Sequence, residues 1–172
     1  MESIEIQLAG GHPNSLGNTI AVVDQVLADN KHFDELFNCY FSADEVVRLR
    51  VSNAMKRIAK VNLKLLLPYL DRFLEEISRI DQASTQWTLA QLFLMLERHM
   101  SEIQRKQASD IMKHNLANHE DWIVLNQTME TLGRWAKKDA KLANWLLPHL
   151  ERLASDPRKS VAKKAKKTQD AL

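Results

Sequence analysis

Residues 42–80 contain two helix-length apolar patterns joined by a short break, and this stretch constrains the fold more than any other. Its first half reads SADEVVRLRVSNAMKRIAK, in which apolar residues recur every three or four positions, as on one face of a helix. These inward positions are Val47, Val51, Ala54 and Ile58. Ser42 or Asp44 is placed to cap this helix. Most charged residues fall elsewhere, so we expect a solvated side that carries Arg48, Arg50, Lys56, Arg57 and Lys60.

The second half, VNLKLLLPYLDRFLEEISRI, carries a broader apolar band, typical of a helix packed on two neighbours. Pro68 lies inside it. A proline deep within a helix costs about 3 kcal/mol, whereas one in a first turn is tolerated. The sequence therefore predicts a short turn over 62–67 that leads into a helix from Pro68. The inward positions are Leu63, Leu66, Leu67, Leu70, Phe73, Leu74 and Ile77.

The segment DEVVRLRVSNAMKRIA, followed by a leucine-rich helix that carries a proline, resembles a HEAT repeat. Proteins of this armadillo-type family stack antiparallel helix pairs into a right-handed α-solenoid. Most of them act as scaffolds or binding surfaces. The resemblance thus implies an all-α fold and a protein-binding role, and it supplies no catalytic residue.

Two similar segments within the chain support a repeat architecture. LLLPYLDRFL at 65–74 aligns with WLLPHLERLA at 145–154 at an offset of 80, which is two periods of about 40 residues. We expect an N-terminal tail over 1–13 and one repeat domain over 14–172. Its approximate repeats are 14–41, 42–80, 84–117 and 120–155, with a capping helix over 156–172.

The expected repeats have specific inward residues. In the tail, Ile4, Ile6 and Leu8 alternate, and we expect the tail to be loose or to lie against the first helix. A helix from Asn14 or Ser15 to about Asp29 is expected next. Its inward residues are Leu16, Ile20, Val23 and Leu27. We expect the partner helix of this first pair to bury Phe33, Leu36, Phe37 and Tyr40, and the third pair to bury Trp87, Leu89, Ala90, Phe93, Leu94 and Leu96 on its first helix and Ile103, Ala108, Ile111 and Met112 on its second. The first helix of the fourth pair has Trp122, Leu125, Met129, Leu132 and Trp135 as its inward residues.

Composition agrees with a helical domain that has a sizeable core. Hydrophobic residues make up 45% and charged residues 27% of the chain, and there are only four glycines and four prolines. The single cysteine, Cys39, excludes an internal disulfide and favours a reducing compartment. We see neither a signal peptide nor a stretch of the roughly 20 apolar residues that a membrane helix needs, so we expect a cytoplasmic protein.

Charge is distributed unevenly along the chain. Residues 1–45 hold eight acidic side chains and one lysine, whereas residues 134–172 hold 11 basic and four acidic ones. Three interpretations remain open: solvated faces, a docking site for an acidic partner or phosphates, and head-to-tail self-association.

Two functions follow from these patterns. The first is a protein-interaction scaffold that binds a partner in the groove of the second helices, where candidate residues are Lys64, Asp71, Arg72, Glu75, Arg105, Lys141 and Arg152. The alternative is sequence-independent nucleic-acid binding by the basic C-terminal end. Its candidate contacts are Arg134, Lys137, Lys138, Lys141, Lys159, Lys163, Lys164, Lys166 and Lys167.

Enzymatic activity has little support in the sequence. Some HEAT-like proteins are DNA alkylation glycosylases, but the nearest candidate here for a base-binding pair, Asp121 and Trp122, reads as a helix cap beside a core residue. His114 and His119 are five residues apart and do not share a helix face as a metal-binding pair requires. We expect no catalytic, cofactor-binding or metal-binding residues, and we expect the four tryptophans to be core residues.

Overall fold

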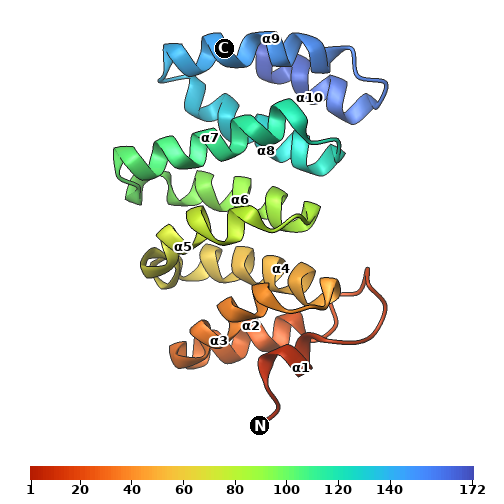
Figure 1. Ribbon diagram of the computed structural model, residues 1–172, viewed down its shortest axis with the longest axis vertical. Coiled ribbons are helices and arrows are strands. Elements are labelled where there is room, and N and C mark those ends of the chain that lie inside the picture. The colour runs from red at the N-terminus through yellow and green to blue at the C-terminus, as the bar shows by residue number, and fades with distance from the viewer. The chain divides into compact units, whose positions relative to one another are not determined.

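The computed structural model describes residues 1–172, and all of its regular structure is helical. Ten α-helices are joined by short turns and five 3₁₀ segments, without a strand, so the expected all-α class is confirmed (Figure 1). The helices form two compact units, Met1–Thr88 and Leu89–Leu172. The sixth helix, α6 (Ala83–Leu96), begins in the first unit and ends in the second.

In the first unit, α4 (Glu45–Val61) is the central helix. The side chain of Asp44 caps it by accepting a hydrogen bond of 2.8 Å from the Val46 amide. The four predicted inward residues of α4 are fully buried, so that prediction is confirmed. Helix α4 packs on α1 and α2 and on the 3₁₀ segments that flank it. The unit's other helices are α1 (Ile4–Leu8), α2 (Thr19–Ala28), α3 (Phe33–Asn38) and α5 (Leu70–Glu75).

The N-terminal segment packs against the next helix, as one of the two expectations had it, but its conformation and the start of that next helix differ from the prediction. Residues 4–8 form a helix, so Ile4 and Leu8 share its buried face while Ile6 is 60% exposed. The next helix begins at Thr19 and buries Val22 and Val26. The predicted start at Asn14 or Ser15 was therefore wrong, and Leu16 and Ile20 are exposed.

Arg50 explains these differences. Its side chain was predicted to be solvated, yet it is only 1% exposed. The guanidinium donates hydrogen bonds to backbone carbonyl oxygens of the 8–15 segment, which wraps around it. A helix starting at Asn14 would use the Ser15 carbonyl within the helix and so remove one of the acceptors of this buried cation. The accepting residues and N···O distances are Leu8 at 2.6 Å, Gly10 at 2.6 Å, His12 at 3.2 Å and Ser15 at 3.2 Å.

The two similar proline-containing segments, residues 65–74 and 145–154, fold differently. Pro68 lies in a 3₁₀ segment, Leu63–Tyr69, and α5 begins only at Leu70, slightly later than predicted. Pro148 lies within the continuous α-helix α9 (Ala140–Ala154). Its missing amide would have bonded to the carbonyl of Asn144, and both residues are exposed, so water can satisfy that carbonyl.

The second unit contains α7 (Glu102–Asn118), α8 (Trp122–Ala136), α9 and α10 (Lys159–Asp170). Ser101 and Gln104 form a capping box at α7, and Asp139 caps α9. Helix α8 packs on α7 and α9, and α10 packs on both α8 and α9, as Figure 1 shows at the C-terminal end. This last packing brings the basic C-terminal helix against a helix of the preceding hairpin.

Most predicted inward residues of the second unit are buried, including Phe93, Met129 and Leu132. Two predictions were wrong: Ile103 is 76% and Trp122 is 49% exposed. Both lie in the first turn of their helices, where no neighbouring helix completes the burial that the apolar spacing indicates. Of the tryptophans, only Trp135 is a fully buried core residue, while Trp87 and Trp145 are half-buried.

Candidate functional site

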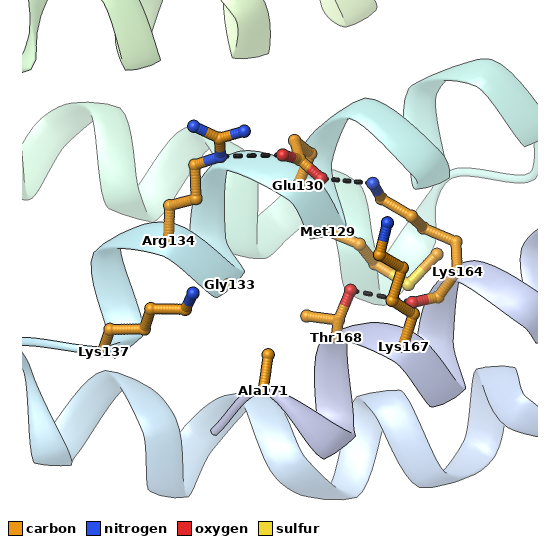
Figure 2. A pocket seen from close by; sticks show the side chains of 9 residues that line it. All are labelled: Met129, Glu130, Gly133, Arg134, Lys137, Lys164, Lys167, Thr168 and Ala171. Carbon is orange, nitrogen blue, oxygen red and sulfur yellow. Dashed lines mark hydrogen bonds and ion pairs between the residues drawn. The ribbon is translucent and has the colours of Figure 1, made fainter.

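The basic residues of α8 and α10 surround a hollow of about 280 Å³. Helix α10 buries Val161, Ala165 and Thr168 against its neighbours. Lys164 and Lys167 lie on the flank of α10 beside this buried stripe and reach the hollow from one side, and α8 supplies the other (Figure 2). The lining residues are Met129, Glu130, Gly133, Arg134, Lys137, Lys164, Lys167, Thr168 and Ala171.

A glycine in the middle of α8 allows the two helices to approach closely. A Cβ atom on Gly133 would lie 2.5 Å from Cγ2 of Thr168, well inside van der Waals contact. The Thr168 hydroxyl donates a hydrogen bond of 2.8 Å to the Lys164 carbonyl, which leaves its methyl group facing α8. The absence of a side chain at Gly133 therefore sets how closely the cations of the two helices approach each other.

Glu130 lies between two of these cations. Its Oε1 accepts a hydrogen bond of 2.7 Å from Nε of Arg134, and its Oε2 accepts one from Nζ of Lys164 (Figure 2). The hydrogen bond from Lys164, and then that from Arg134, hold the pKa of Glu130 below its ordinary value despite partial burial. The carboxylate thus remains charged at neutral pH and fixes both cations at the rim of the hollow.

The other two cations of the hollow have no anionic partner. Lys137 enters from the end of α8 and Lys167 from α10, and neither forms an ion pair. Four cationic side chains and one carboxylate line the hollow, so it carries a formal excess of three positive charges. This excess makes the hollow a candidate site for an anion.

The structure divides the nine predicted basic contacts into groups. Arg134, Lys137, Lys164 and Lys167 meet at the hollow. Three others lie on the outward side of α10 at spacings of four and three residues, and all are exposed. These three are Lys159, Lys163 and Lys166, which we name the outer lysine row. Lys138 is exposed near the end of α8, and Lys141 lies at a second hollow.

This second hollow, of about 400 Å³, is lined mainly by α7 and by the start of α9. Arg105 and Lys141, two of the predicted groove residues, both line it. Arg105 pairs with Glu97 at 2.8 Å, and its guanidinium lies 5.1 Å from the ring centroid of Trp135. Both acidic and basic side chains line the hollow: Glu102, Asp110 and Asp139, and Arg105, Lys106, Lys113 and Lys141.

An aromatic pair lies near this hollow on α9. Trp145 and His149 stack with ring centroids 4.2 Å apart, and the amino group of Lys113 lies 5.4 Å from the Trp145 ring. Partial burial, with the nearby Arg152 cation, lowers the pKa of His149. The half-buried imidazole is therefore neutral at neutral pH and stacks on the indole as an uncharged ring.

The remaining predicted groove residues do not join either hollow. Arg152 donates a hydrogen bond of 3.2 Å to the Leu116 carbonyl and so has a structural role. In the first unit, Arg72 pairs with Glu76 at 3.0 Å and lies over the Phe37 ring. Lys64, Asp71 and Glu75 are exposed.

Sequence reasoning missed Glu130, Gly133 and Thr168, which shape the first hollow. One signal was available: Glu130 precedes Arg134 by four residues, the spacing of a helical ion pair. It also missed the exposure of Trp145 and its pairing with Lys113, because an apolar helix position alone does not distinguish a core residue from a half-buried one.

Asp121 acts as a helix cap, accepting hydrogen bonds from the amides of Ile123 at 2.8 Å and Val124 at 3.0 Å. No three His, Cys, Asp or Glu side chains are grouped to hold a metal ion, and none of the helices has the length and apolar character to span a bilayer. Comparison with protein-family models, curated proteins and solved structures finds no match to this chain.

Proposed function

We propose that this chain is a cytoplasmic, non-enzymatic protein-interaction module, built from HEAT-like hairpins in a right-handed α-solenoid. Its binding surface is the hollow between α7 and α9. The observation that supports the proposal is that α7 and α9, which the resemblance to HEAT repeats makes second helices of successive pairs, line one hollow of about 400 Å³.

The chemistry of this hollow suits a protein segment. Side chains of both charges line its walls, which favours a partner that itself carries charges of both signs. Arginine and tryptophan are the residues that most often dominate binding energy at protein interfaces, and Arg105 and Trp145 lie at or near this hollow. A partner segment would bury the exposed parts of both side chains.

Site-specific crosslinking tests this function. A photoreactive residue replaces Ser109, which lines the hollow, and a matched control replaces Lys60, which is exposed on α4. We expect a discrete protein adduct from position 109 in cells and none from position 60. The adduct should weaken when Trp145→Ala and Lys113→Ala are added. Equal labelling from both positions would contradict binding in the α7–α9 hollow.

Sequence-independent nucleic-acid binding is a second candidate, and the outer lysine row favours it. Three exposed lysines on one side of α10 form a line of positive charge of the kind that contacts successive phosphates. The test is binding to labelled single-stranded and duplex DNA and RNA as a function of salt. We expect a steep loss of affinity with salt in the wild type. Replacing Lys159, Lys163 and Lys166 by glutamate should abolish binding, and binding that survives this triple change would reject the candidate.

A further inference from the structure

The hollow between α8 and α10 differs from the outer lysine row in the arrangement of its charges. Its cations come from two helices and line one half-open hollow, whereas the outer lysines form a line on one helix. Successive phosphodiesters of a nucleic acid each carry one charge and are spread along a strand, so they suit a line of cations. Cations gathered around one hollow suit a compact anion with its charge concentrated at one point.

The lining offers three kinds of contact to such an anion. Arg134 presents a guanidinium whose Nε is held by Glu130, so its two terminal nitrogens remain available as a fork. Lys137 and Lys167 contribute ammonium groups without an anionic partner. Lys164, held by Glu130, adds positive potential at the rim. Together they match the three oxygens and the double negative charge of a terminal phosphate group.

The size of the hollow points to the same ligand class. At about 280 Å³ it lies just below the range of pockets that enclose whole drug-sized ligands, which begins at about 300 Å³. It has room for a phosphate group and the first atoms of the molecule that carries it. The rest of such a molecule would extend into solvent.

We propose that the α8–α10 hollow is a binding site for the dianionic terminal phosphate of a phosphate monoester, held by Arg134, Lys137 and Lys167 with Glu130 as a competing anion. Glu130 has two consequences here. It orients Arg134 and Lys164 while the site is empty, and it lowers the net charge that attracts the ligand. Removing its charge should therefore strengthen binding, which is the opposite of what loss of a contact residue does.

Phenyl phosphate and diphenyl phosphate are the test probes, titrated into the full chain and followed by amide NMR shifts. At pH 8 the monoester is doubly charged and the diester singly charged. We expect the monoester to bind at least about tenfold more tightly, because both the charge and the number of free oxygens fall in the diester. The largest shifts should be those of Gly133, Lys167, Thr168 and Ala171.

Variants locate the site and separate it from the second candidate function. Replacing Lys137 and Lys167 by glutamate should weaken monoester binding at least about tenfold, whereas Glu130→Gln should strengthen it a few-fold. The matched control replaces Lys159, Lys163 and Lys166 by glutamate. If the chain binds nucleic acid through the outer lysine row, this change abolishes that binding, but it should leave the dissociation constant of the monoester within about twofold of the wild-type value. Thermal unfolding followed by circular dichroism verifies that each variant is folded.

The experiments distinguish binding of a terminal phosphate from binding along a nucleic-acid backbone. An oligonucleotide with a 5′-phosphate that binds this site through its end should lose that binding when the terminal phosphate is removed, whereas an oligonucleotide held along its backbone should not. The proposal is overturned if phenyl phosphate produces no saturable shifts at millimolar concentration. It is also overturned if the shifts spread over the outward face of α10, if monoester and diester bind equally, or if Glu130→Gln weakens binding.

Discussion

The guanidinium of Arg50 occupies the space that a side chain at Gly17 would need. A Cβ atom at Gly17 would lie 2.8 Å from both Cζ and Nη1 of Arg50, and Gly17 has a positive φ of 49°. This conformation is accessible to glycine at little cost and strained for most other residues. The N-terminal segment is therefore folded around a buried cation on α4, and the absence of a side chain at Gly17 makes room for it.

Arg50→Met should destabilise the protein by about 3 kcal/mol, because it leaves the carbonyls that now accept charge-assisted hydrogen bonds without a donor. Methionine keeps most of the apolar stem, so the change reports mainly on the guanidinium. Urea unfolding followed by circular dichroism gives the free energy of unfolding. Hydrogen exchange should show loss of protection for amides in α1.

Arg57→Met is the matched control on the same helix. Arg57 is half-buried, and its Nε donates a hydrogen bond of 2.6 Å to the side chain of Asn53, one turn away. A local contact of this kind contributes about 0.5 kcal/mol or less. Equal losses from the two substitutions would contradict the role assigned to the buried guanidinium.

The sequence predicts the helical class and the core of α4 because these depend on local periodicity. Val47, Val51, Ala54 and Ile58 repeat at helical spacing, and the burial of one predicts the burial of the others. Periodicity does not predict the burial of Arg50. A charged side chain is expected to be solvated, and its burial depends on carbonyls some 40 residues away in the chain. Periodicity carries no information about such a distant contact.

The two hollows likewise combine features that the local sequence predicts with features that depend on contacts between distant segments. The richness of the C-terminal end in lysine and arginine was visible in the sequence, whereas the groove of second helices was expected only from the resemblance to HEAT repeats. The selection of Lys137 and Lys167 from nine candidates depends on the rotation of α10 against α8, which the contact of Gly133 with Thr168 sets. A mid-helix glycine signals close approach, but the sequence does not show which segment approaches it.

Gly133→Ala should destabilise the second unit by about 1 to 3 kcal/mol, because the new methyl group would overlap Cγ2 of Thr168. Thr168→Ser removes that methyl group and keeps the hydroxyl that bonds to Lys164. The double variant should therefore recover most of the loss. A double-mutant cycle measured by urea unfolding should give a coupling of at least about 1 kcal/mol, and strict additivity would contradict the close contact.

Glu130→Gln should make stability less dependent on pH. The pKa of Glu130 is lowered in the folded protein from its ordinary value of 4.5, so its contribution is fully present above that pH. It is lost as the pH falls through the lowered pKa, because protonation breaks the pairing with Lys164 and Arg134. The difference in unfolding free energy between wild type and Glu130→Gln should therefore be largest near pH 7 and shrink below pH 4.5.

Glu76→Gln is the comparison for this experiment. The pKa of Glu76 is also lowered, mainly by its hydrogen bond with Arg72, but the pair is open to solvent. Its pH-dependent contribution should be smaller than that of Glu130 and should disappear in high salt. A Glu76 effect as large and salt-resistant as the Glu130 effect would contradict the importance of partial burial at the hollow.

The thiol of Cys39 should react only when the protein opens. Burial, together with the nearby Glu5 and Glu35 carboxylates, raises the pKa of this thiol to about 11. At pH 8 only about one thiol in a thousand is then ionised, and the side chain is shielded from reagents. Labelling with an aromatic disulfide reagent should be slow in native buffer and fast in concentrated guanidinium chloride. The control is Ser155→Cys in a Cys39→Ala background, which provides an exposed thiol that should react quickly without denaturant. If Cys39 in the native wild-type protein reacted as quickly as this control, the segment that carries Cys39 would not be packed as described.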